Sequence, residues 1–167
     1  MRARLFFLAV VLLAVGVGGA HADTLRADKI VVDKSSRRLD VIVNGKVAAS
    51  YRVGLGTAPV GHKQREGDRK TPEGRYVLDF KKADSAYYRA IHISYPNPED
   101  RARAKREGVS PGGAIMIHGQ PNDPVVRTAV ALYPSRDWTD GCIALSNEDM
   151  LALWNMVKVP TPIEIVP

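Results

Sequence analysis

The chain has 167 residues and a formal net charge of +6, with 45% hydrophobic and 25% charged residues. The length suits one domain preceded by a leader, and it is enough to bury a hydrophobic core. This composition excludes a low-complexity or repeat protein. The mildly basic balance favours an anionic surface such as a cell wall. Nucleic acid is not an expected partner, because no DNA- or RNA-binding motif is present.

The first 22 residues are predicted to be a secretory signal peptide that is cleaved after Ala22. Arg2 and Arg4 precede an uncharged apolar run over residues 5–17, and Ala20 and Ala22 supply the small residues that signal peptidase recognises. An uncleaved anchor is the alternative, but the apolar run is shorter than the ~20 residues of a transmembrane helix. No later segment could span a bilayer. The sequence therefore predicts an exported protein of the periplasm or cell envelope that does not span the membrane after cleavage.

The remainder of the chain is predicted to be one mainly β domain. Strands are expected at residues 29–33, 39–43, 47–53, 75–80, 90–94, 114–117, 143–145 and 163–166. The dipeptide Asn44-Gly45 is a strong hairpin signal, so the first three strands should pair in sequence. Residues 54–74 are expected to form a long, basic, mobile loop, and loops of this length are often functional. No alternation of strands and helices supports a Rossmann-like sheet.

Short helical segments are expected between and after these strands. One covers residues 98–107 and ends at Gly108, a helical turn falls near residues 125–132, and a third follows the capping residue Ser146. Basic side chains on the first helix are expected to form a solvated face: Arg101, Arg103, Lys105 and Arg106. Apolar residues at helical spacing in the third are expected to enter the core: Met150, Leu151, Trp154 and Val157.

Cys142 is the only cysteine in the sequence. It cannot form an intramolecular disulfide, and a leftover cysteine in a secreted protein suggests either an intermolecular bridge or a reactive thiol. A buried cysteine that acts as a small hydrophobic residue is the third reading. The count of cysteines does not decide among these readings, so the local sequence has to.

Two segments place a reactive side chain where a short strand meets a glycine, namely His118-Gly119 and Gly141-Cys142. A free thiol has a pKa near ~8.5, so a neighbouring imidazole is needed to accept its proton at neutral pH. The thiolate could then attack a carbonyl carbon, and backbone N–H groups of Cys142 and Gly141 would stabilise the oxyanion. Spacing alone leaves this dyad open, since a Cys and a His occur at such separations in many proteins.

The order of several motifs resembles the L,D-transpeptidase catalytic domain family of bacterial cell-wall enzymes. The matching segments are residues 70–76 (Lys-Thr-Pro-Glu-Gly-Arg-Tyr), 117–119 (Ile-His-Gly), 139–142 (Thr-Asp-Gly-Cys) and 161–165. The resemblance covers about residues 27–166. It implies a β-sandwich-like domain with two or three short helices, which uses no metal or organic cofactor. It also implies that Cys142 is the nucleophile, that His118 donates and accepts the proton, and that the Gly119 carbonyl orients the imidazole.

The sequence departs from the commonest motif of that family at two positions. Asp140 stands where the motif has histidine, and Ala144 stands where it has arginine. The resemblance implies peptidoglycan stem peptides as substrate. Because Ala144 replaces the arginine of the motif, the cation that anchors an acidic stem-peptide group must come from another position in the chain. Candidates are Arg136, Arg69 and Lys70, while Thr139, Asp140 and Gly141 would shape the binding site.

Three functions stay open at this point. The thioester formed on Cys142 could pass to an amine, which would give a cross-link or a lipoprotein attachment. It could instead be used with water or in reverse, which would give an L,D-carboxypeptidase or an amidase. The sequence is similar to a sub-branch with members thought to cleave bonds between peptidoglycan and outer-membrane lipoprotein. The last alternative is a non-catalytic wall-binding module with a structural cysteine. The remaining histidines show no metal-ligand spacing.

Overall fold

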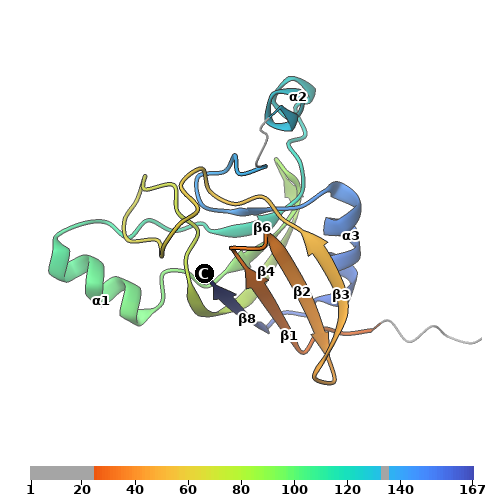
Figure 1. Cartoon of the computed structure of the whole chain (residues 1–167), viewed down its shortest axis with the longest axis horizontal. Coiled ribbons are helices and arrows are strands. Elements are labelled where there is room, and N and C mark those ends of the chain that lie inside the picture. The colour runs from red at the N-terminus through yellow and green to blue at the C-terminus, as the bar shows by residue number, and fades with distance from the viewer. Residues whose placement is uncertain (1–24, 133–135) are drawn as a thin grey trace, which may run out of the picture.

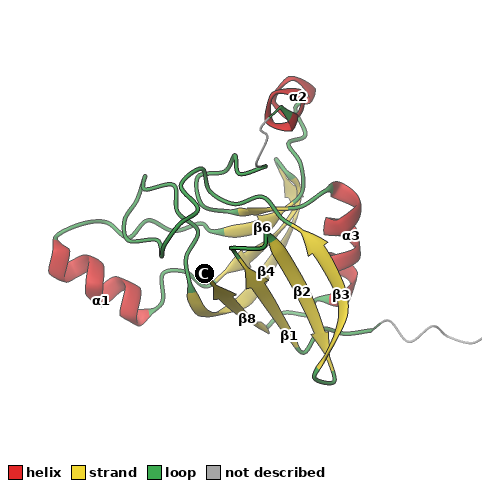
Figure 2. Ribbon diagram, viewed as in Figure 1, coloured by secondary structure: helices red, strands yellow, loops and turns green. Residues whose placement is uncertain are grey.

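A computed structural model of the chain describes residues 25–132 and 136–167, so the predicted signal peptide lies outside the described residues. The strands are β1 (Lys29–Asp33), β2 (Arg38–Val43), β3 (Lys46–Arg52), β4 (Gly74–Ser85), β5 (Tyr88–Ile93), β6 (Met116–His118), β7 (Ile143–Ala144) and β8 (Thr161–Val166). Together they form one sheet in the order β3-β2-β1-β8-β4-β5-β6-β7 (Figures 1 and 2). The prediction of a mainly β domain is therefore confirmed.

The first three strands form the predicted meander. β1 pairs antiparallel with β2, and β2 pairs antiparallel with β3. The hairpin between β2 and β3 turns at Asn44 and Gly45, whose φ angles of 51° and 72° are both positive, as a type I′ turn requires. Leu39 and Val41 are fully buried, and the pairing register shifts between Val41 and Ile42. The bulge explains why Ile42 interrupts the alternation of apolar and polar residues.

β8 joins the meander to the rest of the sheet. It pairs in parallel with β1, where Ile30 lies opposite Ile163, and antiparallel with β4, where Tyr76 lies opposite Ile163. The sheet curls, because Leu39 near one edge belongs to the same buried cluster as Ile117 and Ile143 near the other. The inner faces of the two halves thus enclose a single core, which is the sandwich-like arrangement expected from the sequence.

Three helices lie outside this sheet within the described residues. α1 (Pro98–Glu107) has the predicted bounds, and Gly108 ends it in the left-handed conformation with φ of 66°. α2 (Pro124–Ala131) has no buried residue and stands away from the sheet at the top of Figure 1. α3 (Asn147–Met156) begins after its N-cap Ser146 and contacts β5. None of the helices that the structure describes is long and apolar enough to cross a membrane.

Two details of the helix predictions are wrong. Leu151 was expected in the core but is exposed, whereas Leu153 is fully buried. Met150, Leu153 and Val157 are spaced three and four residues apart, so they share the inner face of α3 and turn Leu151 outward. Arg103 was expected in a solvated face, but its guanidinium donates hydrogen bonds to the Lys63 carbonyl at 3.0 Å and to Asp100 at 3.1 Å. It therefore ties α1 to the loop of residues 54–74.

Candidate active site

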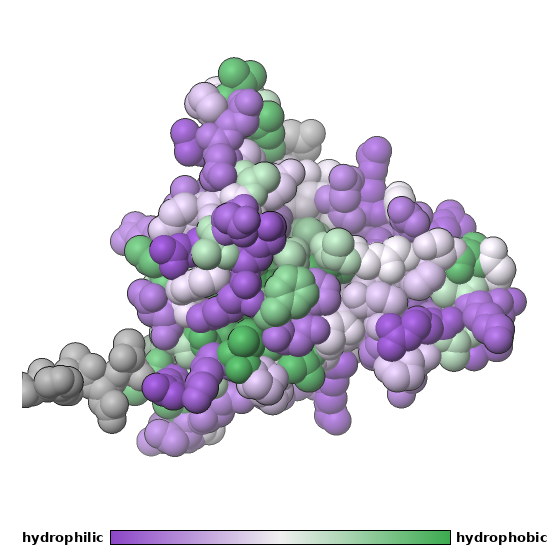
Figure 3. Space-filling model, turned by 180° about the vertical axis from the view of Figure 1, so that it is seen from behind, coloured by the Kyte–Doolittle hydropathy of each residue, from purple (hydrophilic) through white to green (hydrophobic). Residues whose placement is uncertain are grey.

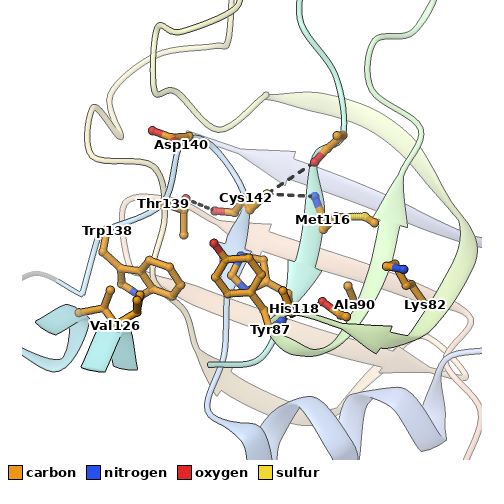
Figure 4. Close-up of a pocket in the computed structure, with 14 residues that line it drawn as sticks. Lys82, Tyr87, Ala90, Met116, His118, Val126, Trp138, Thr139, Asp140 and Cys142 are labelled. Carbon is orange, nitrogen blue, oxygen red and sulfur yellow. Dashed lines mark hydrogen bonds between the residues drawn. The ribbon is translucent and has the colours of Figure 1, made fainter. Parts of the chain in front are cut away.

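Cys142 and His118 line the same cavity, which has a volume of about 520 Å³ (Figure 4). They come from neighbouring strands, because β6 and β7 pair in parallel and Ile117 lies opposite Ile143. This register puts Cys142, just before β7, beside Met116. The Met116 N–H lies 3.4 Å from the Cys142 sulfur, and the thiol lies 3.7 Å from the Ala114 carbonyl. We name the cavity that Cys142 and His118 line the cysteine cavity.

The imidazole of His118 is held in one orientation. Its Nδ1 lies 2.7 Å from the Gly119 carbonyl oxygen. A carbonyl can only accept a hydrogen bond, so Nδ1 carries the proton and Nε2 carries the lone pair that a general base needs. The ring packs against Tyr87, with centroids 4.6 Å apart, and against Trp138, with centroids 5.6 Å apart. These contacts fix the tautomer and the position of the ring.

Burial favours the uncharged forms of both reactive groups. It lowers the pKa of His118, an effect that the Gly119 carbonyl opposes. It raises the pKa of the Cys142 thiol, and the charge of Asp140 adds to the increase, whereas the Met116 N–H and Lys63 oppose it. The structure thus favours an uncharged thiol and an uncharged imidazole in the cysteine cavity.

The turn at residues 139–142 is stabilised by the hydroxyl of Thr139. This hydroxyl donates to the Cys142 carbonyl at 2.7 Å and accepts from the Gly141 N–H at 3.1 Å. Gly141 has a φ of 128°, and a Cβ added to it would lie 2.5 Å from the Lys70 carbonyl, so this position requires glycine. The Cys142 N–H donates no hydrogen bond within residues 25–132 and 136–167, which leaves it available to an oxyanion.

Two segments far away in the sequence brace this turn. Thr139 forms two backbone hydrogen bonds with the loop of residues 54–74. Its N–H donates to the Leu55 carbonyl at 3.1 Å, and its carbonyl accepts from the Thr57 N–H at 3.0 Å. The buried carboxylate of Asp137 accepts from the Leu55 N–H at 2.9 Å and pairs with Arg37 at 2.7 Å. The supporting role of Asp137 was not predicted from the sequence, because no residue near it in the chain indicates that Arg37 of the β1–β2 turn is its partner.

The charged candidates for substrate binding lie in three different places. Asp140 lines the cysteine cavity with a side chain that is 95% exposed, and its carboxylate lies 3.9 Å from the Arg69 guanidinium. Arg136 lines a smaller neighbouring cavity instead. The ammonium of Lys70 lies beside Gly61, away from the residues that line the cysteine cavity.

Several lining residues of the cysteine cavity were not predicted. They are Lys82 from β4, Tyr87 from the β4–β5 turn, and Val126 and Val130 of α2. Lys82 and Tyr87 follow the strand predicted at residues 75–80, and Val126 and Val130 lie in the predicted helical turn, but these positions do not show where the side chains point. The part of the chain that the structure describes contains no cluster of three or more His, Cys, Asp or Glu side chains that could hold a metal ion.

Replacing Gly119 with alanine is expected to destabilise the protein by about 1–3 kcal/mol, because the new methyl group overpacks a filled site. A Cβ at Gly119 would lie 2.6 Å from the side-chain oxygen of Asn147 and 3.0 Å from the Cβ of Tyr88. Urea unfolding measures the change. Gly113→Ala is the matched control, since the nearest atom to its added Cβ lies 3.9 Å away. Equal stabilities of the two variants would contradict the tight packing around Gly119.

The sequence model of the YkuD family, described as the L,D-transpeptidase catalytic domain, matches residues 27–165. The chain belongs to this family. The resemblance read from its motifs is therefore confirmed. YafK of Escherichia coli K12, which is named among L,D-transpeptidases, is 38% identical over 96 residues, which are 54% of this chain and 37% of YafK. The chain thus spans well under half the length of this relative.

Solved structures share the L,D-transpeptidase fold. The helical cell shape determining protein Pgp2 of Campylobacter jejuni is 29% identical with a TM-score of 0.64, over 82% of this chain and 46% of Pgp2. An L,D-transpeptidase of Xylanimonas cellulosilytica matches with a TM-score of 0.54 at 16% identity, over 85% of this chain and 61% of that one. The second likeness concerns the fold alone. The curled sheet is thus a fold that this chain shares with L,D-transpeptidases of known structure.

Proposed function

We propose that this chain is an exported thiol acyltransferase that acts on peptidoglycan stem peptides. The observation that carries the proposal is that Cys142 and His118 line one cavity, with Nδ1 of His118 bound to the Gly119 carbonyl. This geometry supplies a nucleophile, a base with a defined tautomer and an orienting acceptor, as catalytic triads require. Membership of the L,D-transpeptidase family supports peptidoglycan as the substrate class.

The reaction begins when Nε2 of His118 accepts the proton of the Cys142 thiol. The sulfur attacks the carbonyl carbon of the third stem residue, and the carbonyl oxygen takes up the negative charge near the Cys142 N–H. When the C–N bond breaks, the imidazolium gives its proton to the departing nitrogen of the terminal D-alanine. A thioester between the stem peptide and Cys142 remains. No metal or organic cofactor takes part in these steps.

An amine then attacks the thioester carbon and gives a proton to His118, which returns it to the sulfur. The amine could belong to another stem peptide or to an outer-membrane lipoprotein. Water in place of the amine would give a carboxypeptidase, and reversal of the attachment step would release lipoprotein. We favour transfer to an amine because the chain belongs to the L,D-transpeptidase family.

Mass spectrometry of muropeptides tests the proposal. The protein is incubated with a purified tetrapeptide stem, with and without an added amine acceptor. A new peptide bond to the acceptor, with loss of D-alanine, is the expected product. Release of D-alanine in equal amounts with and without the acceptor would contradict transfer to an amine and would indicate hydrolysis of the thioester. A Cys142→Ala variant is the control for background reaction. A wild-type protein that leaves every stem peptide unchanged, yet sediments with cell walls, would favour the wall-binding module instead.

A further inference from the structure

A second cavity of about 240 Å³ lies beside the cysteine cavity. The two cavities share Trp138 and Val130 as walls. Arg52 at the end of β3 and Arg136 line the smaller cavity, which we name the arginine cavity. It is also lined by Ala144 of β7, by Leu145 and by Ser146, the N-cap of α3.

The arginine cavity carries positive charge that the protein does not neutralise. Its described lining residues include no Asp or Glu. Within the part of the chain that the structure describes, neither Arg52 nor Arg136 has a carboxylate partner within 4.0 Å, whereas Arg37 and Arg103 are paired with Asp137 and Asp100. Unpaired guanidinium groups at a cavity attract an anion, and their planar donor pattern fits a carboxylate.

The backbone fixes Arg136 at this place. Its φ of 60° is in the left-handed region, which is unfavourable for a residue with a side chain. The Arg136 carbonyl lies so close to Gly54 that a Cβ there would approach it to 2.0 Å. Gly54 is itself bound to Ala144 of β7 by two backbone hydrogen bonds, of 2.9 and 2.8 Å. Arg136 is thus locked to the strand that follows the cysteine.

The spacing along that strand suits one peptide in both cavities. Cys142 lines the cysteine cavity and Ala144 lines the arginine cavity, while Ile143 between them is fully buried in the core. Alternate residues of an extended segment lie on one face about 7 Å apart. An extended substrate beside this segment would therefore place a group one or two residues from its reacting carbonyl near the arginines.

We propose that the arginine cavity binds a free carboxylate of the peptide that acylates Cys142. The inference rests on the proposed function, and it adds the residues that select an acidic donor. The carboxylate is either the C-terminal one of the stem peptide or, in stem peptides whose third residue has an acidic side chain, the one on that side chain. Both sources share the same chemistry, and both lie within the reach set by the strand spacing.

Peptide binding to the Cys142→Ala protein tests this inference without any turnover. Three tetrapeptides are compared by calorimetry: the free acid, the C-terminal amide and the third-residue side-chain amide. We expect one amide to bind about tenfold more weakly, a change that corresponds to ~1.4 kcal/mol. In a Cys142→Ala protein that also carries Arg52→Gln and Arg136→Gln, the free acid should bind as weakly as that amide. The peptide whose amidation matters identifies the carboxylate.

Arg106→Gln in the same background is the matched control, because Arg106 is exposed in the last turn of α1 and lines neither cavity. It removes the same charge and should leave the preference for the free acid unchanged. If the double arginine variant keeps the full preference, or if neither amide weakens binding, the inference is wrong. Turnover separates this failure from that of the proposed function: a wild-type protein that processes the free acid and both amides at equal rates refutes only the arginine cavity.

Discussion

Replacing Cys142 with alanine is expected to lower the rate of stem-peptide turnover by at least about a thousandfold, since removal of a covalent nucleophile leaves only the binding and oxyanion contributions. In the proposed mechanism the acyl intermediate forms on the Cys142 sulfur. Intact-protein mass spectrometry with a carbapenem, an electrophile that acylates such thiols, provides the direct measurement. The wild type should gain the mass of one adduct, and Cys142→Ala should gain none.

The sequence holds a single cysteine, so any thiol adduct reports on Cys142 alone. The variant should fold normally, because the hydrogen bonds of the sulfur within the described residues are long, at 3.4 and 3.7 Å, and both join it to backbone groups. Thermal unfolding serves as the control for this. A Cys142→Ala protein that unfolds like the wild type but keeps its turnover would exclude the thioester mechanism.

Replacing His118 with asparagine is expected to lower the rate of acylation by about a hundredfold to ten-thousandfold, the usual contribution of a general base. The pH dependence of the wild-type rate is the more specific test. Burial lowers the pKa of His118 below its ordinary value of 6.5, so the imidazole stays neutral and able to accept a proton as the pH falls through 6.5. The acid limb of the rate should therefore have its midpoint below 6.5, and His118→Asn should lack this limb.

Gln120→Ala is a useful comparison for that variant. Gln120 lies just beyond the His118-Gly119 pair and lines the arginine cavity instead of the cysteine cavity. The pH profile of acylation should keep its wild-type acid limb in this protein. A midpoint above 6.5 in the wild type, or an unchanged limb in His118→Asn, would show that another group accepts the thiol proton.

Local patterns predicted most of the secondary structure, because strand alternation, turn dipeptides and helix caps are set by neighbouring residues. The hairpin at Asn44-Gly45 and the helix ending at Gly108 are examples. The place of β8 between β1 and β4 was not predicted, since it depends on which distant strands share a core. The same reason explains the error at Leu151, because the choice between it and Leu153 depends on the surface against which α3 packs.

The two residues proposed as the reactive pair could be recognised in the sequence, whereas the residues that surround them could not. Cys142 and His118 each adjoin a glycine at the end of a strand, which is a pattern within a few residues. Asp137, Lys82 and Tyr87 reach the site or its supporting turn through pairings between strands and loops far apart in the sequence. Among the predicted cations, Arg136 and Lys70 could be distinguished only once the direction of each side chain was known.

The position of β8 also determines when the protein can fold during its synthesis. The N-terminal part of a chain leaves the ribosome first. The pairing of β1 with β8, in which Ile30 lies opposite Ile163, can therefore form only after the C-terminal strand has been synthesised. A product that stops before residue 161 lacks the strand that joins β1 to β4, even though it already contains Cys142 and His118. Such a truncated chain would leave an edge of β1 and of β4 unpaired, and it would be a substrate for proteases rather than an unregulated enzyme.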